Sequence, residues 1–247
     1  MRAPKPISHS ALPAIAWRVA LFLALGFFWW LMLRITLQYV PPRDDVAFLQ
    51  IKQAYIGILH WKIAFFIHVF SSLFVLAAGF TQFWRGILKK LPAVHRWVGR
   101  IYVFDVIFVT GPAGFIMALY ANGGIPSRIS FSILAVLWIL TTAIAFREVL
   151  RRKFAKHREW MIRSYALTLS AVTLRAWKVV LALSFHPHPM DLYRMIAWLG
   201  WVPNIIVAEI LIRKTRVAAR RQPAVASAHE PPGIAQSAGR VGLIPPR

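Results

Sequence analysis

Long uncharged blocks of apolar residues recur along the chain, separated by short segments rich in charge, proline or glycine. Five blocks cover residues 19–33, 63–84, 106–127, 129–146 and 195–208. An α-helix rises about 1.5 Å per residue, so blocks near 20 residues match the roughly 30 Å hydrocarbon layer of a bilayer. A sixth, less apolar candidate at 160–185 contains Arg175 and Lys178. The pattern predicts an all-α, polytopic bundle of about six transmembrane helices.

Proline, glycine and charged residues indicate where these helices end. Asn122-Gly123-Gly124 and His186-Pro187-His188-Pro189 are two such stops, and Gly111-Pro112 and Pro203 are expected to bend their helices. We expect helices two to five to form the core, a tail at 1–16, the bundle at 17–213, and a disordered tail at 214–247. The six helices are predicted over residues 17–38, 58–83, 98–121, 129–146, 160–185 and 192–212.

The distribution of basic residues predicts the orientation of the bundle. The net charge is +22, and 22 of the 30 Lys and Arg residues fall in residues 1–18, 85–100, 147–163 and the segment from 213 onward. These segments share one side of a six-helix bundle, and positive loops stay in the cytoplasm. We therefore expect both termini in the cytoplasm and attraction to anionic lipids at that face. Nucleic-acid binding is not expected.

The composition also excludes several kinds of chemistry. The chain has 58% hydrophobic and 15% charged residues, which is too apolar for a water-soluble core of this length. It contains no Cys, so disulfides, thiolate metal sites and cysteine catalysis are ruled out. Phosphate-binding glycine loops and the common hydrolase motifs are missing from the sequence. Residues 36–40 offer no small-residue cleavage site, so the first block is expected to stay as a membrane anchor.

Two predicted helices carry stripes of small and polar residues, each within an arc of about 80°. One interpretation is a shared cleft in which His60, His68, Arg175 and Lys178 bind an anionic solute. The other is that small residues allow close helix packing and that Arg175 and Lys178 reach the outer interface. The stripes are His60, Ala64, His68, Ser71, Ala78 and Gln82, and Ser164, Thr168, Ala171, Arg175, Lys178 and Ala182.

Asp105 is the carboxylate that lies well inside a predicted span, about a turn and a half after Arg100. A carboxylate at membrane depth needs a partner. We expect a structural ion pair with Arg100, Arg163 or another inward cation, and proton relay is the alternative.

Two segments share the order His, Arg, Trp, then Arg three residues after the Trp, and each is expected to open a helix at the cytoplasmic face. A neutral imidazole there can ligate haem iron, and a guanidinium suits a haem propionate or a quinone oxygen. We therefore predict a cofactor site with His95 and His157 as iron ligands and Arg96, Arg100, Arg158 and Arg163 as charge partners. An interfacial anchoring belt is the alternative. The segments are His95-Arg96-Trp97-Val98-Gly99-Arg100 and His157-Arg158-Glu159-Trp160-Met161-Ile162-Arg163.

At these segments the chain resembles bacterial membrane proteins grouped as domain of unknown function 2306. The family pattern His-Arg-Trp-x-Gly-Arg matches the segment from His95, and His-x-x-Trp-Met-x-Arg matches the segment from His157, with Arg175 as a later Arg. The resemblance covers roughly residues 60–175. It implies a multi-pass protein of the bacterial inner membrane and carries no known activity.

The layout is also distantly similar to diheme cytochromes of the b561 kind, which implies haem b. Those proteins need one His pair near each membrane face, but His60 and His68 share a helix and point about 80° apart. At most one haem with two His ligands therefore fits this sequence. The expected function is electron transfer through haem b or a quinone, with a membrane redox partner. The alternative is a transporter or a lipid- or anion-binding protein with a cleft between helices two and five.

Overall fold

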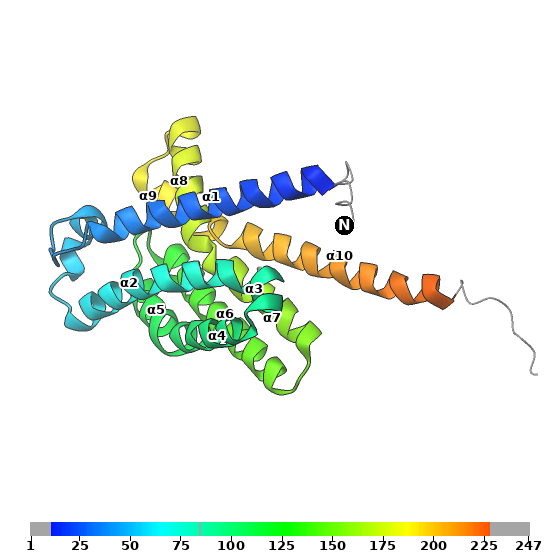
Figure 1. Ribbon diagram of the computed structural model, residues 1–247. Helices are drawn as coiled ribbons and strands as arrows, with labels where there is room; N and C mark the ends of the chain where they lie inside the picture. The colour runs from blue at the N-terminus through cyan, green and yellow to red at the C-terminus, as the bar shows by residue number, and fades with distance from the viewer. Residues whose placement is uncertain (1–10, 84, 228–247) are drawn as a thin grey trace, which may run out of the picture. The chain divides into compact units, whose positions relative to one another are not determined.

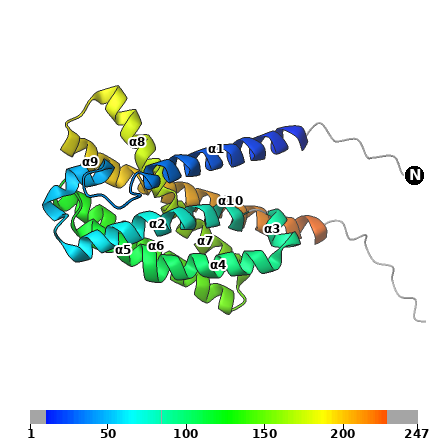
Figure 2. The same ribbon diagram turned by 60° about the vertical axis from the view of Figure 1, so that its left-hand side comes forward.

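The computed structural model describes residues 11–83 and 85–227, and the regular elements in these ranges are all helical (Figure 1 and Figure 2). This confirms the all-α prediction. The order is α1 (Ala11–Leu37), the 3-10 helix η1 (Ala47–Tyr55), α2 (Leu59–Gln82), α3 (Arg85–Lys90), α4 (Pro92–Asp105), the π-helix η2 (Val106–Thr110), α5 (Gly111–Leu119), α6 (Ile125–Leu150), α7 (Phe154–Thr168), α8 (Ser170–Phe185), α9 (Pro189–Leu199) and α10 (Val202–Ser227).

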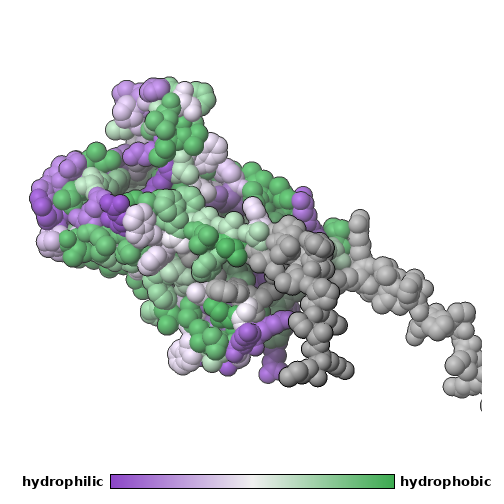
Figure 3. Space-filling model, turned by 45° about the horizontal axis from the view of Figure 1, so that its top comes forward, coloured by the Kyte–Doolittle hydropathy of each residue, from purple (hydrophilic) through white to green (hydrophobic). Residues whose placement is uncertain are grey.

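Five helical stretches of the described residues are long and apolar enough to cross a bilayer, and α7 with α8 makes a sixth when this bent pair is taken as one span. Large apolar side chains such as Phe70, Phe104 and Phe108 are exposed, as lipid contact requires. In Figure 3 apolar residues cover much of the visible face, beside a hydrophilic patch at its left end. The stretches are Val19–Leu37, Leu59–Gly79, Pro92–Leu119, Ile125–Leu150 and Pro189–Ala219.

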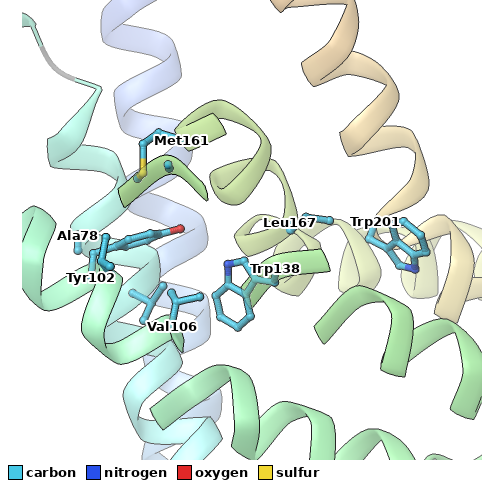
Figure 4. Packing of buried hydrophobic residues seen from close by; sticks show 10 residues of the cluster. Ala78, Tyr102, Val106, Trp138, Met161, Leu167 and Trp201 are labelled. Carbon is cyan, nitrogen blue, oxygen red and sulfur yellow. The ribbon is translucent and has the colours of Figure 1, made fainter. Parts of the chain in front are cut away.

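The main buried cluster joins the four helices that were predicted to form the core, and Trp201 lies beside them (Figure 4). Helices α2 and α7 approach closely at Gly79, where a Cβ atom would come within 1.8 Å of the Tyr165 ring. The cluster consists of Val75 and Ala78 of α2, Tyr102, Val103 and Val106 of α4 and η2, Trp138 and Ala145 of α6, Met161 and Leu167 of α7, and Trp201.

The third predicted helix departs from α-geometry where a kink was expected. Gly111 donates its backbone N–H to the carbonyl of Val106, five residues earlier, which closes a π turn. Pro112 follows and has no N–H to continue the α-helical ladder. A Cβ at position 111 would lie 2.2 Å from the Val106 carbonyl oxygen, so glycine is required at this turn.

Two other helices are interrupted differently from the prediction. The fifth predicted helix is divided at Leu169 into α7 and α8, which are bent by 40°. The sixth is divided into α9 and α10 at Gly200 and Trp201, just before the expected bend at Pro203.

The expected tails also differ in part from the structure. The first compact unit ends at Glu209, and the second begins at Ile210 within α10. Helix α10 continues to Ser227, through residues that were expected to be disordered. Residues 1–10 and 228–247 of the two predicted tails lie outside the described residues.

Candidate functional site

The two predicted His motifs lie in the first turns of α4 and α7. Pro92 opens α4 and needs no hydrogen-bond partner for a backbone N–H, which favours a helix start at this residue. His95 follows three residues later, and His157 is three residues after Phe154, the first residue of α7. We call the part of the first unit that contains residues 85–100 and 147–163 the basic end.

A buried hydrogen-bond network fixes which faces of α4 and α7 meet. The Tyr102 hydroxyl of α4 lies 2.8 Å from Ser164 Oγ and 2.9 Å from Thr168 Oγ1 of α7. Trp138 of α6 donates to Thr168 Oγ1 at 3.0 Å, and Thr142 Oγ1 lies 2.7 Å from Ser164 Oγ. In Figure 4 the Tyr102 side chain extends from α4 between the helices, beneath Met161. Three helices are thus joined at one level.

The same faces carry His95 and His157. Each histidine precedes its network residue, Tyr102 or Ser164, by seven positions. Seven residues turn a helix by about 700°, so each histidine lies within about 20° of that face and about 10 Å closer to the basic end. The two imidazoles also interact electrostatically. The structure therefore brings the two predicted ligands together.

The hydrogen bonds of the two rings differ. His157 Nδ1 lies 2.8 Å from the Ala145 carbonyl oxygen, which can only accept, so this nitrogen carries a proton, and in the neutral ring the lone pair is on Nε2. His95 Nδ1 is buried without a hydrogen-bond partner. Gln82 Nε2 and Glu148 Oε2 are also buried without a hydrogen-bond partner. Three of the five side-chain atoms of this kind in the described residues therefore come from helices of the basic end. Because buried polar atoms are normally bonded, this region is suited to a polar ligand.

The four predicted arginine partners separate into two groups. Arg96, Arg100 and Arg158 have exposed side chains, and Arg100 stacks 5.4 Å from the Trp97 ring centre. Arg163 instead pairs with Glu209 through two hydrogen bonds of 2.5 and 3.0 Å. It also lies 4.4 Å from the ring centre of Trp160. The structure thus leaves three of the four arginines accessible to a ligand.

The alternative site is brought together only in part. His68 Nδ1 lies 3.0 Å from the Thr110 carbonyl oxygen, and His60 Nε2 lies 2.7 Å from the Tyr120 hydroxyl. Arg175 donates to the Ala171 carbonyl of its own helix and interacts electrostatically with His68. Lys178 is exposed on α8.

The predicted polar stripe of the fifth helix is not continuous. The break at Leu169 separates Arg175 from Ser164 and Thr168, which are buried in the core network. An open, mainly apolar groove of about 460 Å³ does lie beside α2, and His60 and Ile67 line it. Its other wall is formed by η2 and α5, with Phe108 and Pro112. The groove therefore lies between predicted helices two and three, and not between two and five.

Asp105 has a hydroxyl partner in place of the expected cation. Its Oδ1 lies 2.5 Å from Thr110 Oγ1, which is 2.5 Å from Ser71 Oγ of α2. The ion pairs of residues 11–83 and 85–227 do not include Asp105. The α-helical pattern does not predict Thr110 as a partner of Asp105, because residues five apart lie on different faces of an α-helix. Gly111-Pro112 was the signal for the π turn that brings them together.

No curated protein and no solved structure shows a significant match to this chain. The family described as predicted membrane protein, domain of unknown function 2306, matches residues 65–212, which is more than half of the chain. The match includes α4, η2, α5, α6 and α7, and with them both histidines and Asp105. The chain therefore belongs to the domain of unknown function 2306 family of predicted membrane proteins.

Proposed function

We propose that this membrane protein transfers electrons through a haem b held by His95 of α4 and His157 of α7. One observation carries the proposal: both imidazoles lie at the same level on the faces by which α4 and α7 meet, as the Tyr102–Ser164 hydrogen bond establishes. Two His ligands from facing helices are the donor set that a low-spin haem needs. A quinone is the natural redox partner in the same bilayer.

The ring hydrogen bonds support this donor set. A histidine that ligates a metal usually donates its other ring N–H to a carbonyl or carboxylate, which orients the ring and makes the ligating nitrogen more basic. His157 has this arrangement through Ala145. His95 Nδ1 has no hydrogen-bond partner in the structure, so no protein contact of this nitrogen fixes the tautomer of the ring. Haem b, when bound, supplies a one-electron couple between ferric and ferrous iron.

Other residues of the protein would orient the haem and fix the spacing between α4 and α7. The exposed guanidinium groups of Arg96, Arg100 and Arg158 can bind the two propionate carboxylates. The network of Tyr102, Ser164 and Thr168 holds α4 and α7 together about 10 Å deeper. Because this buried network already holds the two helices in place, ordering the two histidines around a haem costs little free energy.

Absorption spectroscopy on the full chain, purified in detergent and supplied with haem, tests the proposal. We expect a Soret band with the features of two His ligands in the wild type. His95→Ala and His157→Ala should each lose those features, because one axial ligand is missing. His60→Ala is the matched control, since His60 pairs with Tyr120 away from the basic end, and it should keep the spectrum. A wild type that stays colourless would exclude the haem, and unchanged spectra in both variants would exclude His95 and His157 as its ligands.

A second candidate is binding of an anionic solute or lipid at His68 and Arg175, with transport as its purpose. The electrostatic interaction of Arg175 with His68 places these two side chains near each other and favours it. A guanidinium group at membrane depth attracts an anion. Short-chain phosphatidic acid is a suitable probe: Arg175→Ala should lose its binding, and Arg43→Ala, whose parent residue pairs with Asp45, should not. Unchanged binding in the Arg175 variant would rule this out.

A further inference from the structure

A hydrogen-bonded series of three polar side chains links α4 and η2 to α2 at membrane depth. Asp105 is 8% exposed and Thr110 is fully buried. Asp105 Oδ1, Thr110 Oγ1 and Ser71 Oγ are linked in that order by contacts of 2.5 Å each, and Ser71 Oγ lies 2.6 Å from the Ile67 carbonyl oxygen. This hydrogen-bonded series therefore has three contacts, and it ends on a carbonyl oxygen that can only accept.

Counting protons shows what an ionised Asp105 would require. A carboxylate only accepts, so Thr110 must donate its single hydroxyl proton to Asp105. Ser71 must then donate its own proton to Thr110. No proton is left for the contact between Ser71 and the Ile67 carbonyl, although these oxygens are 2.6 Å apart. Two acceptors at this distance repel each other.

A neutral Asp105 satisfies all three contacts at once. The carboxylic acid donates to Thr110, Thr110 donates to Ser71, and Ser71 donates to the Ile67 carbonyl. The backbone N–H of Thr110 also donates to this carboxyl group, and a neutral acid keeps an acceptor oxygen for it. Neutrality also avoids the cost of burying a carboxylate without a cation.

The surrounding charges do not compensate an ionised form. His68 of α2 contacts the same turn, where its Nδ1–H donates to the Thr110 carbonyl. Among the described residues, the titratable and charged groups of the packed helices make no ion pair with Asp105. These groups are His60, Lys62 and His68 on α2, Lys89 and Lys90 on α3, His95, Arg96, Arg100 and Tyr102 on α4, Arg128, Arg147 and Glu148 on α6, and Lys156, His157, Arg158, Glu159, Arg163 and Tyr165 on α7.

We infer that Asp105 is a proton-binding site within the membrane, occupied at neutral pH, and that loss of its proton reverses the hydrogen bonds through Thr110 and Ser71. When the acid O–H bond breaks and water takes the proton, the Thr110 hydroxyl turns to donate to the carboxylate. The Ser71 hydroxyl then turns from Ile67 to Thr110. Protonation is thereby linked to the contact between α2 and η2. The site does not depend on the haem.

Infrared spectroscopy of the full chain in lipid nanodiscs tests this inference. An ordinary Asp, with a pKa of about 3.9, is ionised at about pH 7 and has no carboxylic acid C=O band. We expect such a band in the wild type and its loss in Asp105→Asn, whose amide can replace the acid as a donor to Thr110. Asp191→Asn is the matched control, since Asp191 is exposed beside Arg194, and the band should remain. Absence of an Asp105-dependent band at this pH would overturn the inference.

A second pair of variants keeps Asp105 and tests the hydrogen bonds that link it to Thr110 and Ser71. Thr110→Val preserves the side-chain volume but removes the acceptor of the acid proton, so the C=O band should move to higher frequency. Ser71→Ala, one step further along, should move it less. A band that does not move in Thr110→Val would show that the acid does not donate to Thr110. Because the band requires no cofactor, a colourless protein would leave this result unaffected.

Discussion

Lys52 shows how one buried cation can control the stability of the region around η1. Its side chain is 2% exposed, and Nζ donates to the Tyr120 carbonyl and to Asn122 Oδ1. Burial, together with the charge of Arg128, lowers the pKa of Lys52 to about 8. Two neutral acceptors hold the ammonium group without a carboxylate, so its charged form is less favourable in the fold than in water.

This depressed pKa predicts how stability changes with pH. An unfolded Lys has a pKa of about 10.4, so between about pH 8 and that value the unfolded chain binds more protons than the fold. The contribution of Lys52 to stability must therefore increase with pH across that window. Thermal unfolding in detergent should show a smaller rise for Lys52→Met than for the wild type. Lys178→Met, at an exposed position, should keep the wild-type slope; equal slopes in all three proteins would contradict the assignment.

Among the helices, the π turn of η2 brings the Thr110 hydroxyl within hydrogen-bond distance of Asp105. Gly111 makes that turn possible. Gly111→Ala would place a methyl group 2.2 Å from the Val106 carbonyl oxygen and 2.6 Å from Ile139. Overpacking of this kind costs roughly 1–3 kcal/mol of stability. We expect lower thermal stability together with a shifted infrared band of Asp105, because the turn must rewind.

Gly26→Ala provides the matched control for this substitution. Gly26 also lies within a predicted membrane helix, but a Cβ atom there would meet nothing within 4 Å. Alanine is the better helix former by up to about 1 kcal/mol, so this variant should be as stable as the wild type or more stable. If Gly111→Ala behaved in the same way, the π turn would not depend on glycine.

The elements also show how far sequence patterns reach. Apolar blocks predicted the spans and the core helices because lipid selects for composition over about 20 residues. The His motifs lie in the first turns of α4 and α7, but the helices were predicted from residues 98 and 160 and begin six residues earlier, at Pro92 and Phe154. The break at Leu169 has no proline or glycine to announce it, so the polar stripe appeared continuous. Thr110 was not predicted as the partner of Asp105 because their spacing follows a π turn. Glu209 was not predicted as the partner of Arg163 because the two residues are far apart in sequence.

At the scale of the whole molecule, the bent pair α7 and α8 decides the topology. Five helical stretches qualify as spans by themselves, and the pair is either a sixth span or a re-entrant loop. Six crossings place the amino terminus and the end of the last span on one side, and five place them on opposite sides. Residues 85–100 and 147–163 lie on the side of the amino terminus in both cases, and only six crossings put the basic segment from residue 213 onward on that side as well, so the positive-inside rule favours six.

Reporter fusions can count the crossings. We expect a cytoplasmic reporter signal from fusions at the amino terminus, within residues 151–153 and after Arg213. A fusion within residues 43–46 should report the opposite side and serves as the control. A reporter after Arg213 that is active only outside the cytoplasm would show that α7 and α8 do not cross the membrane.

The π turn has one more consequence for the span from Pro92 to Leu119. It contains one residue more than an α turn, and each residue advances a helix by about 100°. A helical wheel drawn from α4 and continued through α5 therefore assigns the residues after Thr110 to the wrong sectors. Lipid-facing and protein-facing positions in this span follow two separate wheels, and a substitution chosen from a single wheel would be made on an unintended face.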